Sequence, residues 1–466
     1  MGIAASLFFT SNDTEKQTLH RRITPSDEQM DEQIARWNEL ADHLISDLRS
    51  RSGHPIRTWL QGSYKYATQI RPPSKGEEFD IDLGVFYCWP GKPKDGTHGP
   101  AALRDMAQSS MLEYAKTAPG VKHVTVPPKP RCMRIHYEGD FHIDVPTYHL
   151  DQDADARTLA CEHGWEISDP KSIYLWFQKL FEEGMRTKVR RHIRYMKCWA
   201  GLKWTIGNGR PSSVLLTVLA AEACAELDDA AMGQDDDTLL AILQQIATRI
   251  QRSNVVENPV NRKENLNRLT EKHWSNFCAG VNEFITLAAY ACNASTAIDA
   301  VDQWAKAFKH FFPMVDQSAL AEDAMAKSTA LVPVSVPDVM VDAVARANKH
   351  LTFADRNRIG PIPKDCDIHF RLLNPERLPV GATVEWVVRN EGAEAENIND
   401  LGHSSGFGYK AKNRSAYTGT HFMDCIIRLN GRVHSVRRIP VTITGMPAPR
   451  RNPLTKPNYV RLLERK

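Results

Sequence analysis

The sequence of 466 residues predicts an α+β protein with a mixed α/β part, a helical part and a small β-rich domain. Three observations support this prediction. Over residues 1–167, one long helical pattern precedes segments in which apolar and polar residues alternate. Over residues 168–328, apolar residues recur almost throughout at helical spacing. Over residues 365–446, short alternating segments return, which indicates an antiparallel β domain.

The composition is that of a globular protein with several domains. Hydrophobic residues make up 42% and charged residues 25%, and the net charge of +3 argues neither for nor against a nucleic-acid partner. No run of about 18 apolar residues occurs, so we expect no membrane span. The nine cysteines include no C-x-x-C pair, which favours free thiols and a cytoplasmic location.

The first part begins with one long amphipathic helix. Ser26-Asp27-Glu28 has the pattern of a helix start, and apolar residues follow at helical spacing from Met30 to Leu48. A short strand over 56–61 then leads into Gly62-Ser63. Further on, strand-forming segments over 131–137 and 141–145 flank the turn Glu138-Gly139-Asp140, which predicts a hairpin.

The remaining elements follow from the same periodicities. We expect helices over 170–183, 186–204, 212–227, 238–252, 263–292 and 296–312. Residues 329–364 should form a Pro-spaced linker with one more helix over 338–349. Strands are expected over 368–372, 383–389, 424–429 and 433–443, and 447–466 is a basic, Pro-rich tail.

Three aspartates are candidate catalytic and metal-binding residues. Asp80 and Asp82 alternate with apolar residues on a strand, so both carboxylates point to one face, and Asp144 alternates in the same way on another strand. Hard oxygen ligands suit magnesium, and two such ions about 3.5–4 Å apart can neutralise a triphosphate and activate an attacking hydroxyl. Gly62 allows the backbone to approach a phosphate closely, and Ser63 can donate a hydrogen bond to it.

Each of these residues could instead have a purely structural role with no part in catalysis. A lone D-x-D is common on surface strands, but the Gly-Ser turn at a strand end and the third acid together favour nucleotidyl transfer. His142 shares a strand face with Asp144. It could contact a ligand, although we favour a hydrogen-bonded structural role.

The strings Q-G-S-Y-K-Y-A-T and F-D-I-D-L-G-V resemble those of the bacterial CD-NTases, which are DncV-like members of the polymerase-β nucleotidyltransferase superfamily. The resemblance implies a bilobal fold: a mixed-sheet catalytic lobe with an N-terminal spine helix over 1–167, and a helical lobe over 168–328 that closes the nucleotide cleft. R-Y-M-K-C-W and R-P-S-S-V-L-L resemble the family's triphosphate-binding segments, but the aromatic residue that usually follows the serine is absent. The implied nucleotide-binding residues are Gln61, Gly62, Ser63, Tyr64, Lys65, Tyr66, Lys197 and Ser212, with Ser213 second to Ser212.

The C-terminal part resembles the sensor domain fused to some of these enzymes. The matching positions are Trp386, Asn390, Gly392, Tyr417, Gly419 and His421. We expect Trp386 to lie in the core, whereas Tyr417 and His421 are candidates for contacting a ligand. The resemblance does not identify that ligand.

The resemblance implies synthesis of a cyclic di- or trinucleotide from nucleoside triphosphates, with ATP and GTP as favoured substrates and pyrophosphate released. Two Mg²⁺ ions are implied, for which Mn²⁺ can substitute, and the product would activate a downstream effector in anti-phage (CBASS) signalling. A linear oligoadenylate synthase, a toxin-type nucleotidyltransferase that modifies protein or tRNA, and a non-catalytic nucleotide sensor remain alternatives. Nucleic-acid binding along the basic residues 186–197 is possible but not favoured.

Overall fold

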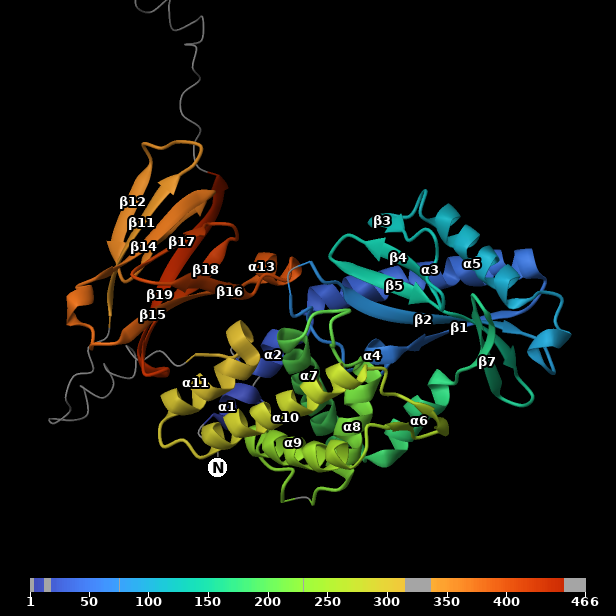
Figure 1. Cartoon of the computed structure of the whole chain (residues 1–466). Helices are drawn as coiled ribbons and strands as arrows, with labels where there is room; N and C mark the ends of the chain where they lie inside the picture. Colours follow the sequence, from blue (N-terminus) through green and yellow to red (C-terminus); the bar gives the residue numbers. More distant parts are fainter. Residues whose placement is uncertain (1–3, 12–17, 75, 229, 315–336, 448–466) are drawn as a thin grey trace, which may run out of the picture. The chain divides into compact units, whose positions relative to one another are not determined.

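A computed structural model describes residues 4–11, 18–74, 76–228, 230–314 and 337–447. The chain forms two compact units, Met1–Pro313 and Met314–Lys466, which we describe separately (Figure 1). Residues 329–336 of the predicted linker region and residues 448–466 of the predicted tail lie outside the described residues. Within the described part, no helix is both long and apolar enough to cross a bilayer. All nine cysteines fall in that part, and each is a free thiol.

An eight-stranded mixed sheet forms the first lobe of the first unit. Its strands are β1 (Ile56–Gln61), β2 (Phe79–Cys88), β3 (Val121–Val124), β4 (Met133–Tyr137), β5 (Phe141–Val145), β6 (Thr147–Asp151), β7 (Ala156–Cys161) and β8 (Gly164–Ile167). The order is β3-β4-β5-β2-β6-β7-β8, and β1 also pairs with β2. Because β2 runs parallel to β5 and β6 and antiparallel to β1, its residues lie beside three other strands.

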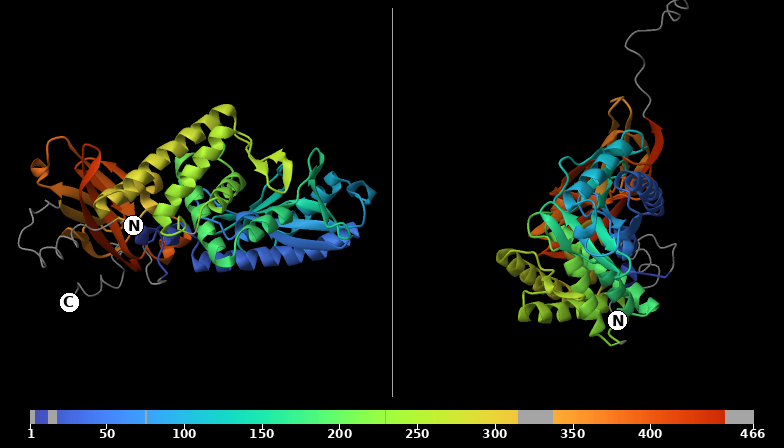
Figure 2. Two further views of the ribbon diagram at one scale, coloured as in Figure 1. Left: turned by 90° about the horizontal axis from the view of Figure 1, so that it is seen from below. Right: turned by 90° about the vertical axis from the view of Figure 1, so that its right-hand side faces the viewer.

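Two helices, α3 (Asp27–Ser52) and α5 (Pro100–Tyr114), contribute to the same hydrophobic core as the sheet (Figure 2). Ser26 and Gln29 form a capping box at the start of α3, and Gly53 ends it in the left-handed conformation. Ile81, Leu83 and Val85 of β2 are buried in this core with α3 and α5. The alternation of a strand therefore places Asp80 and Asp82 on the opposite face of the sheet.

The helical lobe follows the predicted pattern, with one exception. Its helices are α6 (Pro170–Leu180), α7 (Glu183–Lys203), α8 (Ser213–Ala225), α9 (Asp235–Arg252), α10 (Glu271–Cys292) and α11 (Ala297–Phe308). The prediction of one helix over 263–292 is wrong. Strands β9 (Glu257–Asn258) and β10 (Asn261–Asn265) pair as a hairpin, and Thr270 starts α10 by accepting a hydrogen bond from the N–H of His273.

The N-terminal residues pack on the helical lobe rather than on the first lobe, to which the range 1–167 assigned them. Phe8 of α1 (Ala5–Phe8) lies in an aromatic cluster with Tyr195 of α7 and Trp304 of α11. From α2 (Leu19–Ile23), Arg22 donates to the carbonyl of His310. Sequence periodicity could not reveal these contacts, since the partners lie far along the chain.

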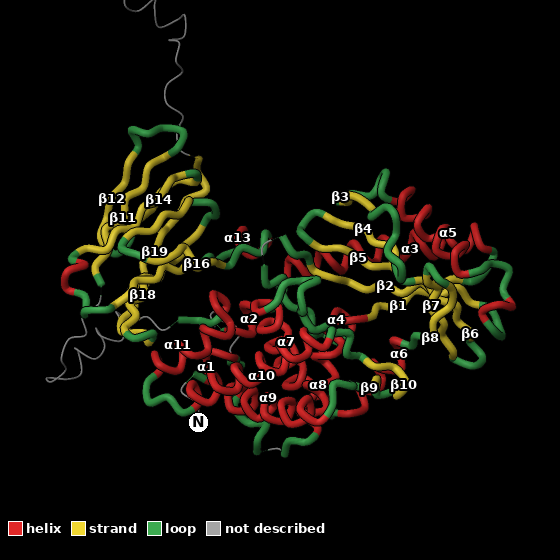
Figure 3. Tube along the Cα trace, viewed as in Figure 1, coloured by secondary structure: helices red, strands yellow, loops and turns green. Residues whose placement is uncertain are grey.

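The second unit is a β sandwich of two sheets (Figure 3). One sheet has the order β12-β11-β14-β17 and the other β13-β19-β18-β15-β16, and both contribute to a single core. The elements are β11 (Asp338–Ala345), β12 (Thr352–Arg356), β13 (Ile359–Lys364), β14 (Cys366–Leu373), β15 (Ala382–Arg389), α13 (Ala393–Asn397), β16 (Gly402–Phe407), β17 (Lys410–Arg414), β18 (Gly419–Leu429) and β19 (Arg432–Pro447). All pairs are antiparallel except β13 with β19.

The helix predicted over 338–349 is wrong, because β11 occupies most of that range. Its burial alternates strictly, with Val339, Val341, Ala343 and Ala345 in the core. The period of two was present in the sequence, but alanines and charged residues there also suit a helix. The β domain consequently starts before residue 365, since β11, β12 and β13 all precede it.

The predicted sensor positions are held by hydrogen bonds within the protein. Trp386 lies in the core, as expected, and its indole N–H donates to the carbonyl of Gly408 (2.7 Å). Tyr417 donates to Asp400 (2.8 Å). His421 accepts from the N–H of Glu391 at Nδ1 (3.2 Å), so Nε2 donates to the carbonyl of Tyr417 (2.8 Å). Both ring nitrogens of His421 are thus used by the fold.

A buried ion network in the second unit gives a stability prediction. Asp424 is fully buried and accepts from the guanidinium groups of Arg389 (2.6 Å) and Arg438 (3.0 Å). We expect Asp424→Asn to destabilise this unit by about 3–5 kcal/mol, since it leaves buried cations without their counter-charge. Calorimetry of the whole chain measures this change. The exposed Asp367→Asn is the control, with an expected change of about 0–1 kcal/mol. Equal effects of the two substitutions would contradict the prediction.

Candidate active site

The three predicted aspartates lie together on the face of the sheet opposite the core. Asp82 on β2 is in register with Asp144 on β5, and Asp80 is in register with His142. The carboxylate of Asp82 also lies against Gly62, where a Cβ atom would come within 1.9 Å of Oδ2. Gly62 has a φ of +57°, so both its backbone conformation and its missing side chain are required there.

The electrostatics of the cluster differ between its members. Burial raises the pKa of Asp82 well above its usual value, and the charges of Asp80 and Asp144 raise it further. Burial acts in the same direction on Asp144, but hydrogen bonds and charge from Arg134 bring its pKa below the usual value. The guanidinium of Arg134 donates hydrogen bonds to both carboxylate oxygens of Asp144, from Nε to Oδ1 and from Nη2 to Oδ2 (2.7 Å). Lys129 lies 3.5 Å from Oδ2.

The residues present suit a divalent cation. The carboxylates of Asp80, Asp82 and Asp144 lie close together, and burial and their mutual repulsion raise the pKa of Asp82. Asp80, His142 and Asp144 offer ligand atoms that all lie within 4.8 Å of one another. Carboxylate oxygens are hard ligands, which magnesium and manganese prefer.

A chain of hydrogen bonds holds Asp80 in place. His142 contacts Asp80 Oδ1 with Nε2 (2.9 Å) and Glu78 Oε2 with Nδ1 (2.9 Å). The same oxygen of Glu78 contacts Nδ1 of His136 (2.8 Å). His142 therefore has the hydrogen-bonded role that we favoured, and one of its partners is a candidate catalytic residue.

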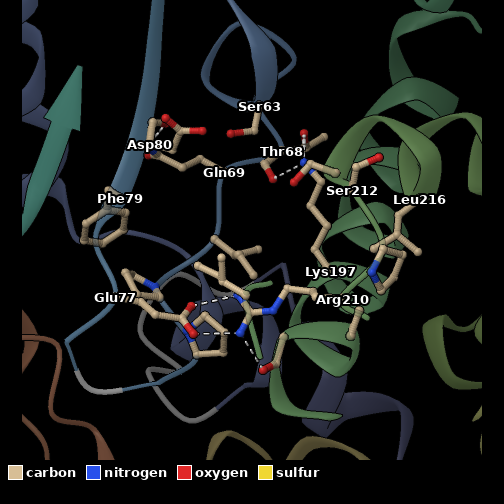
Figure 4. A pocket seen from close by; sticks show the side chains of 18 of the residues that line it. Ser63, Thr68, Gln69, Glu77, Phe79, Asp80, Lys197, Arg210, Ser212 and Leu216 are labelled. Carbon is tan, nitrogen blue, oxygen red and sulfur yellow. Dashed lines mark hydrogen bonds and ion pairs between the residues drawn. The ribbon is translucent and has the colours of Figure 1, made fainter. Parts of the chain in front are cut away.

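A cavity of about 320 Å³ adjoins Asp80 (Figure 4). Ser63 of α4 (Gly62–Lys65) lines it beside Asp80, and Lys197 of α7 faces it together with Ser212 and Ser213 at the start of α8. Ser212 caps α8 by accepting from the N–H of Leu215 (3.3 Å). The fold thus gathers hydroxyl and ammonium groups from three distant segments at one side of the carboxylates.

Four predicted nucleotide-binding residues, Gln61, Tyr64, Lys65 and Tyr66, are not among the residues that line this cavity. Gln61 is buried and accepts from the hydroxyl of Tyr148 (3.1 Å). Tyr64 accepts from the indole of Trp37 (3.3 Å), and Lys65 lies over the rings of Trp59 and Tyr174. Tyr66 is buried against Tyr174 and Phe177. A sequence motif that resembles the family's does not show which of its side chains point into the cavity, because successive residues of a turn point in different directions.

The structure also adds residues that the sequence reasoning missed. Arg134 could have been found, since it alternates with Met133 and Ile135 on the predicted hairpin strand beside that of Asp144. Thr68 had no such signal: it accepts from Lys197 Nζ through both its hydroxyl (3.0 Å) and its carbonyl (3.2 Å). Arg210 pairs with Glu77 through two hydrogen bonds (2.7 and 2.8 Å) at the edge of the cavity (Figure 4).

Two family models match the chain. Residues 56–148 match the nucleotidyltransferase domain described as "Cyclic GMP-AMP synthase DncV-like". Residues 316–444 match the "Adenylyl/Guanylyl and SMODS C-terminal sensor domain". The first match contains Gly62 and all three aspartates, and the second contains the β sandwich except for its last residues.

Among curated proteins, a cyclic GMP-AMP synthase of Escherichia albertii is 27% identical over 458 residues, which cover 97% of this chain and 98% of that protein. The cyclic GMP-AMP synthase of Vibrio cholerae is 28% identical over 203 residues, or 34% of this chain and 45% of that protein. Among solved structures, Vibrio cholerae DncV has a TM-score of 0.55 at 19% identity and covers 67% of this chain and 98% of its own. The last comparison shows the fold. The two family models assign residues 56–148 to a DncV-like nucleotidyltransferase domain and residues 316–444 to a C-terminal sensor domain of the Adenylyl/Guanylyl and SMODS type.

Proposed function

We propose that this nucleotidyltransferase joins nucleoside triphosphates, with ATP and GTP as its favoured substrates, into a cyclic dinucleotide. The observation that carries the proposal is the convergence of Asp80, Asp82 and Asp144 beside a cavity lined by Ser63 and Lys197. Carboxylates on one side and phosphate-binding groups on the other are what transfer from a triphosphate requires. The relatives named above make the cyclic dinucleotide the best-supported product, and a cyclic trinucleotide is the alternative.

In this proposal the three aspartates hold two Mg²⁺ ions, for which Mn²⁺ can substitute. Bound there, the ions would neutralise the triphosphate and lower the pKa of the attacking hydroxyl. His142 keeps Asp80 oriented, and Arg134 must share or release Asp144, both of whose oxygens it contacts in this structure. Asp80 remains 52% exposed and so is open to solvent and to ligands.

The remaining residues position the triphosphate. Ser63 and Ser212, with Ser213 beside it, can donate hydroxyl protons to phosphate oxygens, and Lys197 can move from Thr68 to a phosphate. A ribose hydroxyl oxygen of one nucleotide then attacks the α-phosphorus of the other. Pyrophosphate leaves with the electrons of the broken bond, the hydroxyl proton passes to solvent, and a second transfer closes the ring.

The biological setting is also part of the proposal. The cyclic product would bind a downstream effector, which fits anti-phage (CBASS) signalling. Nucleoside triphosphates are cytoplasmic metabolites, so we place the reaction in the cytoplasm.

Product analysis tests the function. The full-length chain is incubated with Mg²⁺ and all four triphosphates, and the products are treated with phosphatase and identified by mass spectrometry. A phosphatase-resistant cyclic dinucleotide supports the proposal. A linear product with a terminal phosphate, or label transferred to protein or tRNA, contradicts it. If no product forms in vitro or in cells, and wild type does not differ from Asp80→Ala, only a nucleotide-binding role would remain.

Lys197 gives a pH prediction. Burial, together with the nearby charge of Arg194, lowers its pKa to about 7, so the free enzyme loses this ammonium charge above neutral pH. A bound triphosphate interacts favourably with the charged ammonium group, so above pH 7 Lys197 must take up a proton when the triphosphate binds. The affinity for a non-hydrolysable ATP analogue should therefore fall above pH 7, by up to about tenfold per pH unit.

Calorimetric titration at pH 7, 8 and 9 measures this effect. Lys197→Met should weaken binding and remove the pH dependence. Lys203→Met is the matched control, because Lys203 lies on the same helix and pairs with Glu283 (2.7 Å). The same pH dependence in Lys197→Met as in wild type would refute the assignment.

A further inference from the structure

The outward face of the sheet β12-β11-β14-β17 carries four basic side chains on two neighbouring strands. Arg371 of β14 is directly opposite Lys410 of β17, and His369 is opposite Lys412. All four are exposed, whereas Phe370, Leu372 and Ala411 between them are buried in the sandwich. We call His369, Arg371, Lys410 and Lys412 the basic face.

Two carboxylates share this outward face, since Asp342 of β11 lies opposite His369 and Asp367 precedes His369 by two residues on β14, but neither forms an ion pair with the basic face within the described residues. Arg371, Lys410 and Lys412 make no ion pair there, although other cations of the same sheet do: Arg356 pairs with Asp338, and Arg414 pairs with Asp365. Like charges directly opposite one another in an antiparallel pair are about 4.5–5.5 Å apart at Cβ and are destabilising. Packing gives no reason for this arrangement, since the four side chains point to solvent.

Two exposed aromatic residues lie within three positions of Lys410 along the chain. Phe407, the last residue of β16, is 72% exposed, and Tyr409 is 52% exposed in the turn that leads from β16 into Lys410. The turn is anchored: the carbonyl of Gly408 accepts from Trp386 (2.7 Å), and the carbonyl of Tyr409 accepts from the N–H of Leu372 (2.9 Å). Two aromatic side chains exposed two residues apart offer flat apolar surface to a partner.

Cations that can contact phosphates, next to rings on which bases can stack, are the combination by which proteins bind single-stranded nucleic acid. An acidic protein would use the cations but would not need the rings. A duplex is less suited, because its bases stay stacked within the helix, and a helix or β-ribbon must enter a groove to reach them. The basic face is instead an open sheet surface with a row of cations across two strands.

We propose that the basic face, with Phe407 and Tyr409, is a binding site for single-stranded RNA or DNA on the second unit. Phosphates contact Arg371, Lys410 and Lys412, and unstacked bases lie on Phe407 and Tyr409. This site is separate from the carboxylate cluster and does not depend on the proposed reaction. The ligand of the sensor domain would then be a single-stranded nucleic acid.

Fluorescence anisotropy of labelled oligonucleotides of about 16 nucleotides tests the site on the full-length chain. Wild type should bind single-stranded RNA or DNA more tightly than the matching duplex. Lys410→Gln/Lys412→Gln should weaken binding at least about tenfold. It should also reduce the slope of log affinity against log salt by about 1.4, since each phosphate contact to a single strand contributes about 0.7.

Two further double variants separate the contributions. Phe407→Ala/Tyr409→Ala should weaken binding at least about tenfold without changing the salt slope, because stacking releases no counterions. Lys349→Gln/Arg432→Gln removes the same charge from two exposed positions elsewhere on this unit, one in a turn and one at the start of β19, and should bind like wild type. Circular dichroism and thermal unfolding check that every variant is folded.

Four results would overturn the proposal. They are no binding of single strands by wild type at about 50 mM salt, equal loss in the control variant, no loss in Lys410→Gln/Lys412→Gln, and a preference for duplex. Acidic peptides that compete fully, together with no effect of Phe407→Ala/Tyr409→Ala, would assign the surface to an acidic protein instead.

Discussion

Asp82→Asn is expected to abolish nucleotidyl transfer without weakening the fold. Asp82 is the carboxylate with the raised pKa, because it is buried and lies beside Asp80 and Asp144. Metal ions at such sites contribute several kcal/mol to the transition state, and each ~1.4 kcal/mol is tenfold in rate, so kcat should fall at least about 10³-fold. Asparagine keeps the shape but cannot supply the negative charge.

The same substitution should leave thermal stability equal or higher when a chelator is present. A carboxyl whose pKa is raised on folding contributes stability that is fully present at low pH and is lost as the pH rises towards the raised value. At neutral pH the wild-type chain therefore bears the cost of like charges held together, and Asp82→Asn removes part of it. Adding Mg²⁺ should raise the melting temperature of wild type but not of Asp82→Asn.

Pyrophosphate release and differential scanning fluorimetry measure the two effects. Asp105→Asn, an exposed carboxylate on α5, is the control and should change neither. An active Asp82→Asn enzyme would refute the role of this residue. A large loss of stability would mean that Asp82 supports the fold rather than the reaction.

Gly62→Ala should impair both activity and stability, for two separable reasons. The left-handed backbone (φ +57°) costs a non-glycine residue about 1–2 kcal/mol. The new methyl group would also lie 1.9 Å from Asp82 Oδ2, so the carboxylate must move. A displacement of about 1 Å at a reacting centre can cost about 10²-fold, and we expect a loss of at least that size in kcat/KM.

Gly53→Ala separates the two reasons. Gly53 also has a left-handed backbone (φ +71°), but its Cβ would meet no atom within 4 Å. This variant should lose a similar amount of stability in urea unfolding and keep its activity. If Gly62→Ala and Gly53→Ala were equally active, the contact between Gly62 and Asp82 would not matter for the reaction.

Much of the site was predictable because its signals are local. The alternation around Asp80 and Asp82 depends only on neighbouring residues, and it correctly placed both on the face opposite the core. The long helix α3 was predicted from the spacing between Met30 and Leu48 and from the helix-start pattern at Ser26-Asp27-Glu28. Where two local patterns competed, as in β11, the prediction was wrong because burial against a distant partner decided between them.

The sequence by itself determined which residues could perform the chemistry: two aspartates on one strand face, a glycine before a serine, and a third aspartate on another strand. The tertiary structure alone decided which of them meet. The parallel register of β2 and β5 sets Asp144 beside Asp82, and the packing of α7 brings Lys197 to Thr68. These contacts join residues far apart in the chain. They depend on how whole elements pack, and no local pattern of side chains encodes that.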